Sequence, residues 1–252
     1  MAKTFEALTR SENEHRAPSA SSLAQTSERE TIITSRHVLD LGSDAARSYQ
    51  DLRTDILTRY KDDSIKTILF TGTAHGDGAS TTAFNFSVVL ARESGLKVLL
   101  GDLNPGTEDQ HITFESDSDR IEEAVNDLPG PDGSRINEKW IGPGNLHSLV
   151  YRGNHPNVIN LIESGVLEEF LKTTSKRFDY IILAAPPVLG SLEARAICAK
   201  VDGVVLVIAS GKTRRQIARK CKETLEEAGG RVLGVVLNRR RHYIPQWIYR
   251  RL

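Results

Sequence analysis

The sequence predicts an α/β domain: a mostly parallel, twisted sheet with helices on both faces. The first observation is a set of short runs with continuous apolar character, which is typical of strands buried on both faces of a sheet. These runs lie at residues 66–72, 97–101, 178–184, 203–209 and 231–237. The second observation is that helix-like stretches separate the runs, each long enough for a right-handed crossover between parallel strands. They lie at about residues 80–94, 161–175, 190–200 and 212–228.

The other elements complete the expected domain organisation. Residues 1–42 are predicted to form a short N-terminal helix and a flexible, serine-rich linker, and residues 43–240 the core domain. The core is expected to begin with a helix at about residues 44–60, where apolar residues recur at helical spacing. The turn-rich segment 115–155 is expected to hold one short helix and one strand. Residues 241–252 form a basic, aromatic tail.

The composition excludes several classes of protein. Lysine plus arginine and aspartate plus glutamate each number 33, so no overall charge attracts the chain to nucleic acid, which is not an expected partner. No apolar stretch approaches the ~18 residues that span a bilayer, and the start of the chain lacks the apolar centre of a secretion signal. The cysteines, Cys198 and Cys221, lack metal-ligand spacing and are expected to be reduced thiols. We therefore expect a cytoplasmic protein.

The first turn from strand to helix, TGTAHGDGASTT at residues 71–82, has the composition of an anion-binding loop. Its glycines allow successive backbone N–H groups to point inward, and the following helix contributes its positive N-terminal end. A complete phosphate loop reads G-x-x-x-x-G-K-[S/T]. Here Gly78 supplies the glycine and Ser80 the hydroxyl, but Ala79 occupies the lysine position. A purely structural turn is the alternative interpretation of this segment.

Several segments together resemble the bacterial protein-tyrosine kinases, a branch of the ParA/MinD-type P-loop ATPases with CpsD and CapB as members. They are GDGASTT, KVLLGDLNP, FDYIILAAPPVL, KVDGVVLVIASGKTRR and RVLGVVLNR, in this order along the chain. The resemblance implies a P-loop fold that binds ATP or ADP with magnesium. The implied nucleotide-binding positions are Gly76, Asp77, Gly78, Ala79, Ser80, Thr81 and Asn238, the last at the adenine edge. Ser80 and Asp102 are the implied magnesium ligands, and Asp102 is the residual catalytic candidate.

Three positions depart from the family pattern. The family's loop lysine is replaced by Ala79, the second acid of its LLIDADLR motif by Asn104, and the acid of its VIIDTPP motif by Ala184. Phosphoryl transfer depends on positioned positive charge, so these changes predict a degenerate site with weak or absent kinase activity and with nucleotide and magnesium binding retained or lost. Arg214 or Arg215, after a strand end, is a candidate replacement cation; a solvated helix start is the alternative.

The resemblance also implies partners. The family's E-x-x-R-x-x-R motif, which packs subunits in a ring, has Arg47, Gln50 and Arg53 at its charged positions, so a homo-oligomer would have an altered interface. The expected partner is a membrane-anchored, Wzz-like polysaccharide co-polymerase, whose cytoplasmic segments would hold the protein at the inner face of the membrane. The tail is a candidate docking element, and packing against its own domain is the alternative. The predicted function is non-catalytic regulation of exopolysaccharide assembly; an active autokinase and a ParA/MinD-like switch are the alternatives.

Overall fold

An eight-stranded sheet forms the centre of the computed structural model, which describes residues 44–61, 65–104, 124–129, 135–140, 145–152 and 158–239. The strand order is β3-β4-β5-β2-β6-β1-β7-β8. Along the chain the strands are β1 (Thr67–Gly72), β2 (Val98–Asp102), β3 (Ala124–Pro129), β4 (Arg135–Trp140), β5 (Leu146–Arg152), β6 (Tyr180–Ala185), β7 (Gly203–Ala209) and β8 (Val232–Asn238). The strands β5, β2, β6, β1, β7 and β8 pair in parallel, whereas β4 pairs with β5 and with β3 in the antiparallel direction.

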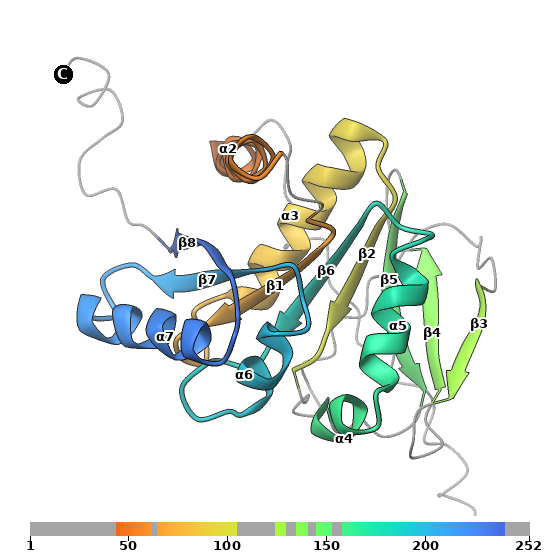
Figure 1. Ribbon diagram of the computed structural model, residues 1–252. Coiled ribbons are helices and arrows are strands. Elements are labelled where there is room, and N and C mark those ends of the chain that lie inside the picture. Colours follow the sequence, from red (N-terminus) through yellow and green to blue (C-terminus); the bar gives the residue numbers. More distant parts are fainter. Residues whose placement is uncertain are drawn as a thin grey trace, which may run out of the picture.

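Helices cover both faces of the sheet (Figure 1). They are α2 (Asp44–Arg59), α3 (Ala79–Ser94), α4 (Val158–Glu163), α5 (Val166–Thr174), α6 (Glu193–Cys198) and α7 (Arg215–Glu227). Side chains of α2 and α3 share one buried apolar cluster with one face of the central strands. Side chains of α4, α5, α6 and α7 pack against the opposite face in a second cluster. The predicted three-layer α/β fold is therefore confirmed.

The central strands show why the sequence has continuous apolar runs. Every residue of β1 and of β7 is buried, because each strand lies between two neighbours and beneath helices on both faces. Alternation of polar and apolar residues is consequently absent from these strands. The carboxyl ends of β1, β2, β6, β7 and β8 lie at one edge of the sheet, where an open parallel sheet binds its ligands.

Two predictions about secondary structure need correction. The helix expected at residues 161–175 is divided into α4 and α5, because Gly165 adopts a left-handed φ of 73° at the junction. The short helix expected within residues 115–155 is absent from the described part of that segment, which instead forms β3, β4 and β5. The expected strand is β5, and the LPGPDGS turn signal begins in the last two residues of β3 and ends directly before β4, its antiparallel partner.

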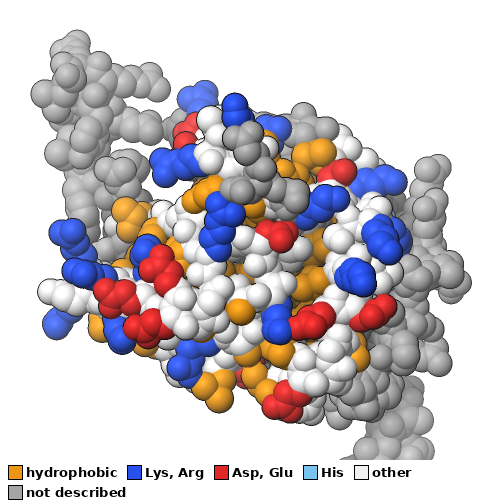
Figure 2. Space-filling view, in the orientation of Figure 1, with side chains coloured by type: hydrophobic (Ala, Val, Ile, Leu, Met, Phe, Trp, Pro, Cys, Tyr) orange, Lys and Arg blue, Asp and Glu red, His pale blue; other side chains and the backbone are white. Residues whose placement is uncertain are grey.

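Other predictions fall outside the described residues or concern the surface. The N-terminal helix and linker within residues 1–42 and the tail at 241–252 lie outside the described residues. None of the helices in the described part of the chain combines the length and the apolar character needed to cross a bilayer. Figure 2 shows acidic and basic side chains interspersed over the visible face, in keeping with the formal net charge of +0.

Candidate functional site

The loop between β1 and α3 contains the predicted anion-binding site. Gly76 and Gly78 have positive φ angles of 81° and 91°, which L side chains rarely adopt. Gly78 is the N-cap residue of α3, and its carbonyl accepts hydrogen bonds from the backbone N–H of Thr82 at 2.9 Å and from Thr82 Oγ1 at 2.8 Å. The loop thus ends at the N-terminus of a 16-residue helix, where partly unpaired backbone N–H groups favour an anion.

Asp77 stabilises this loop from the inside. Its side chain is 1% exposed, and Oδ2 accepts hydrogen bonds from Thr73 N–H at 2.9 Å, Thr73 Oγ1 at 2.5 Å and Ala74 N–H at 3.0 Å. The other oxygen, Oδ1, is buried and has no hydrogen-bond partner among the described residues. The carboxyl group of Asp77 therefore organises the turn, and its backbone N–H donates to the carbonyl oxygen of Ala74 at 3.3 Å. Its role in binding a nucleotide stays a prediction.

Asn238 joins the end of β8 to the same loop. Its Nδ2 donates to the carbonyl oxygen of Asp77 at 2.9 Å, and its Oδ1 accepts from Arg239 N–H at 2.8 Å. A Cβ atom at Gly78 would lie only 2.2 Å from Asn238 Nδ2, so glycine is required there for space as well as for its φ angle. Asn238 is thus placed beside the loop, and its role at an adenine edge stays a prediction.

The structure brings Ser80, Asp102 and Asn104 together. Asn104 Nδ2 donates to Asp102 Oδ1 at 2.6 Å and to Ser80 Oγ at 3.1 Å, and Asn104 N–H donates to the same Asp102 oxygen at 3.0 Å. Ser80 lies in the first turn of α3 and Asp102 at the end of β2. The residue that replaces the family's second acid is therefore a bridge between the two predicted magnesium ligands.

This group fits a magnesium ion that is bound mainly through phosphate oxygens. A hydroxyl and a carboxylate are oxygen donors of the kind that Mg²⁺ prefers, and such sites commonly need just one or two carboxylates besides phosphates and water. Within the described residues, no group of three or more His, Cys, Asp or Glu side chains could hold a metal ion. Ser80 and Asp102 therefore suit a metal that arrives with a nucleotide.

The two alanines at family charge positions lie in an apolar environment. Ala184 is 1% exposed and is the register partner of Asp102 on the neighbouring strand, and its carbonyl accepts a hydrogen bond from Leu103 N–H at 2.8 Å. It belongs to the buried cluster under α2 and α3, which also includes Phe70. Ala79 is partly buried and packs against the same cluster. Methyl groups thus occupy both places where the family pattern has a charged side chain.

A second loop, between β7 and α7, approaches the first. Thr213 Oγ1 is 3.2 Å from Thr73 Oγ1, a hydrogen-bond distance. Lys212 Nζ is 4.0 Å from the position that a Cβ atom would take at Gly76, and it is the atom nearest to that position outside the adjoining residues. Lys212 therefore lies beside the loop, and the candidate role of Arg214 or Arg215 as a replacement cation stays a prediction. The position of Lys212 directly after Gly211, at the carboxyl end of a strand beside β1, was the available signal.

Among the remaining predicted residues, Thr81 is exposed on the first turn of α3. On α2, Arg47 is exposed, and Gln50 and Arg53 are half-buried. Arg53 lies close enough to Tyr180 to oppose the effect of burial, which raises the pKa of the Tyr180 hydroxyl. The Arg53 side chain therefore interacts with its own domain as well as occupying a predicted interface position.

The two cysteines belong to the core of the domain. Cys198 and Cys221 are both buried and free, as expected. Burial raises the pKa of each thiol, and for Cys221 the acidic group of Asp77 raises it further. Both side chains thus behave as small apolar groups of the core.

A phosphate-type loop at the carboxyl edge of a parallel sheet defines a P-loop ATPase fold, and comparisons agree. A family model described as an AAA domain matches residues 65–221. The tyrosine-protein kinase YwqD of Bacillus subtilis is 30% identical over 77% of this chain and 80% of its own length, and CpsD of Streptococcus agalactiae is 30% identical over 76% and 82%. The crystal structure of the chimerical protein CapA2B2 covers 84% of this chain and 94% of its own, with 25% identity and a TM-score of 0.67. The chain belongs to the bacterial tyrosine-protein kinase family of P-loop ATPases.

Proposed function

We propose that this protein binds ATP or ADP with magnesium at the loop before α3 and transfers phosphate very slowly or not at all. P-loop ATPases of this family bind ATP or ADP with magnesium. The observation that carries the proposal is the buried methyl group of Ala184 beside Asp102, at the position of the family's acid. Together with Ala79, it removes two of the charges that a transferring phosphoryl group requires.

The physical cost of these losses is substantial. Lysine and magnesium neutralise the charge on the oxygens of a transferring phosphoryl group, and this electrostatic term dominates such catalysis. A charged hydrogen bond contributes about 1.5–3 kcal/mol, so the loss of the lysine alone slows the reaction by about tenfold to a few hundredfold. The loss of the acid at position 184 weakens the positioning of magnesium as well. Bound magnesium would supply charge neutralisation, with Ser80 and Asp102 as its protein ligands.

The proposed biological role is regulation of polysaccharide assembly. The family is linked to capsule and exopolysaccharide synthesis. We infer that this protein binds the cytoplasmic segments of a membrane-anchored, Wzz-like co-polymerase and is peripheral to the inner face of the membrane. The chimerical construction of CapA2B2, a similar structure, is consistent with a partner of this kind. A homo-oligomer would have an altered interface, because Arg47 stands on the exposed side of α2 where the family motif has an acid.

An active autokinase is the second candidate. It is favoured by the arrangement of Asn104 between Ser80 and Asp102, which keeps the two predicted magnesium ligands within one hydrogen-bonded group. A ParA/MinD-like switch, which would bind and release nucleotide without modifying tyrosine, is compatible with the same group. These candidates and the non-catalytic proposal differ in ATP turnover and in tyrosine phosphorylation, so measurements of these two activities distinguish them.

The test uses the full chain, purified and analysed for retained nucleotide, followed by calorimetric titration with MgATP and MgADP. Single-turnover assays with radiolabelled ATP then measure hydrolysis and tyrosine phosphorylation. We expect micromolar or weaker nucleotide binding and no phosphotyrosine above background. Phosphotyrosine that disappears in Asp102→Ala would overturn the non-catalytic proposal and establish the autokinase. Absence of any nucleotide binding would overturn the proposed site and leave a scaffold.

A further inference from the structure

Lys212 is a lysine beside the phosphate-type loop, on a different strand end from the lysine that the family pattern places within it. Its Nζ lies 4.0 Å from the Cβ position of Gly76. We propose that Lys212 binds the phosphates of the nucleotide and takes over part of the function of the lysine missing at Ala79. This inference rests on the proposed nucleotide binding and adds to it the side chain that would recognise the phosphates.

The backbone around Lys212 holds it at this place. Gly211 has a left-handed φ of 75°, and the N–H groups of Lys212 and Thr213 both donate to the carbonyl oxygen of Ala209 at 3.2 Å. Strand β7 pairs in parallel with β1, so the turn that follows β7 emerges next to the turn that follows β1. The contact between Thr213 Oγ1 and Thr73 Oγ1 then connects the two turns directly. Lys212 is therefore positioned by a pair of connected turns on neighbouring strands.

The charges around the site explain why phosphate groups would need the ammonium group of Lys212. Asp77 lies inside the loop and Asp102 at the end of β2, whereas Ala79 and Ala184 are neutral. A polyanionic ligand would consequently bind near two acidic residues, with no lysine inside the loop. Within the described part of the chain, no hydrogen bond or ion pair engages the Lys212 side chain, which is exposed. Its donors are thus available to a ligand that enters over Gly76.

The location predicts which part of the ligand Lys212 contacts. Lysine at position 79 would extend from the first turn of α3, beneath the phosphates. Lys212 instead lies beside Gly76, three residues before Ala79. In this position, Lys212 would contact the phosphate groups of the nucleotide and not its base. Removing the Lys212 side chain should therefore weaken the binding of ADP and of inorganic pyrophosphate alike.

The experiment compares Lys212→Ala with the wild type and with Lys220→Ala, a matched change at an exposed lysine of α7. Calorimetry with MgADP, and displacement of a fluorescent ADP analogue by pyrophosphate, give the dissociation constants. We expect Lys212→Ala to raise both constants by about threefold to a hundredfold, the range for a charge-assisted hydrogen bond at an exposed position. Lys220→Ala should stay within twofold of the wild type.

Two other outcomes would overturn the role of Lys212, and one of them would also overturn the proposed function. If the wild type binds MgADP and Lys212→Ala stays within threefold of Lys220→Ala, the role of Lys212 is wrong while nucleotide binding stands. If the wild type binds neither MgADP nor pyrophosphate, the proposed function and the role of Lys212 are both wrong.

A second variant, Ala79→Lys, tests whether Lys212 takes over part of the function of a lysine at position 79. Ala79→Lys should increase MgADP affinity more in the Lys212→Ala background than in the wild type, because two cations near one phosphate group partly replace each other. Equal gains in both backgrounds would show that the two positions act independently and would contradict the proposal. The melting temperature of each variant controls for loss of fold.

Discussion

Asp102 and Ala184 are register partners at the ends of the neighbouring parallel strands β2 and β6. The first carries a carboxyl group that Asn104 connects to Ser80, and the second carries a methyl group buried in the apolar cluster beneath α2 and α3. One strand end thus carries a polar group, while the adjacent strand end is part of the core. The effect on stability of placing charged residues at positions 184 and 79 therefore depends on this pair of residues.

Ala184→Asp is expected to destabilise the protein. A carboxylate at a side chain that is 1% exposed loses its hydration, and Asp102 beside it has the same sign of charge. We expect the free energy of unfolding in urea to fall by about 3–5 kcal/mol, the range for an unpaired buried charge. Ala184→Asn, which has the same shape without the charge, should cost distinctly less.

The paired change Ala79→Lys with Ala184→Asp should recover part of that loss, because a lysine in the first turn of α3 offers the new carboxylate a partner. It should also increase affinity for MgATP in calorimetry. If the double variant is no more stable than the Ala184→Asp variant and binds nucleotide no better than the parent, the loop has lost the geometry of a phosphate site.

Gly78→Ala is expected to disturb the loop for two separable reasons. The φ of 91° is unfavourable for alanine, and the new Cβ would lie 2.2 Å from Asn238 Nδ2. Strain at a left-handed position costs about 1–2 kcal/mol. In the Asn238→Ala background the collision is removed and only the φ strain remains. Thermal and urea unfolding of the four proteins in this cycle should therefore show a smaller cost of Gly78→Ala when Asn238 is absent. An equal cost in both backgrounds would contradict the predicted contact.

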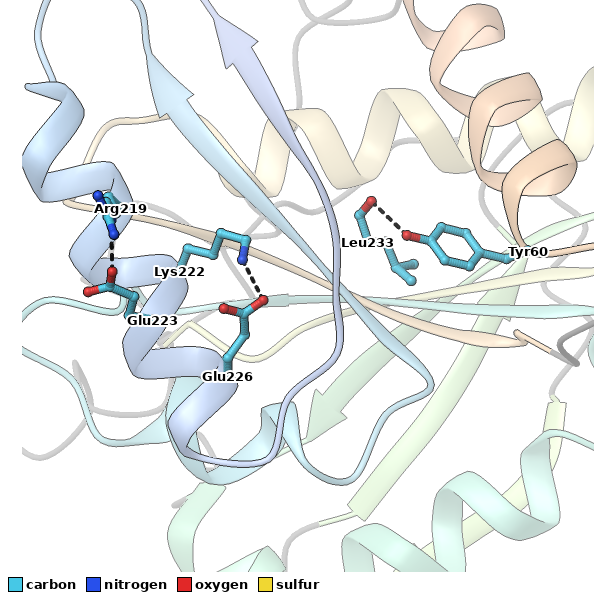
Figure 3. Close-up of polar contacts among 6 residues, drawn as sticks. All are labelled: Tyr60, Arg219, Lys222, Glu223, Glu226 and Leu233. Carbon is cyan, nitrogen blue, oxygen red and sulfur yellow. Dashed lines mark hydrogen bonds and ion pairs between the residues drawn. The ribbon is translucent and has the colours of Figure 1, made fainter.

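Tyr60→Phe tests how the helix before the core is held in place. Tyr60, directly after α2, donates its hydroxyl hydrogen to the carbonyl oxygen of Leu233 in β8 at 3.1 Å (Figure 3). The guanidinium group of Arg231 lies 4.8 Å from the centre of the Tyr60 ring. Removing the hydroxyl should lower the free energy of unfolding by about 1 kcal/mol and leave the ring contact intact.

A matched control is available on α7, where Figure 3 also shows the exposed ion pairs Arg219–Glu223 and Lys222–Glu226. Glu223→Gln removes one such pair and should cost at most about 0.5 kcal/mol, because exposed ion pairs contribute little. If Tyr60→Phe costs no more than this control, the contact with β8 does not fix α2.

The fold could largely be predicted because its central strands and crossover helices have continuous apolar or helical patterns. Strands β3 and β4 are not predicted because AVNDLP and RINEKW have no strong apolar alternation. Strand β4 pairs with β5, and β3 in turn pairs with β4. Sequence spacing identified the loop positions at 76–81. The contacts of Asn104 and Lys212 depend instead on side-chain directions between segments that are distant along the chain. The Asn238–Asp77 contact, for example, joins residues 161 positions apart.

The last prediction concerns residues 243–252, which lie outside the described residues. Strand β8 leads towards them and already exposes apolar side chains, with Val235 48% and Leu237 63% exposed. Each large apolar side chain that is buried contributes about 1.5–3 kcal/mol, so Trp247, Ile248 and Tyr249 favour a buried location. The arginines that precede these residues, at 239–241, and those that follow them, at 250 and 251, suit a protein or headgroup surface outside this domain.

We therefore expect deletion of residues 243–252 to leave the melting temperature nearly unchanged and to weaken binding to the cytoplasmic segments of the co-polymerase. Deletion of residues 250–252 alone, which keeps Trp247 and Tyr249, is the control and should bind more tightly than the longer deletion. Scanning calorimetry and pull-down with the purified segments measure the two properties. A melting temperature lowered by several degrees, with partner binding unchanged, would show that the tail packs against its own domain, because the apolar side chains would then contribute to folding and not to association.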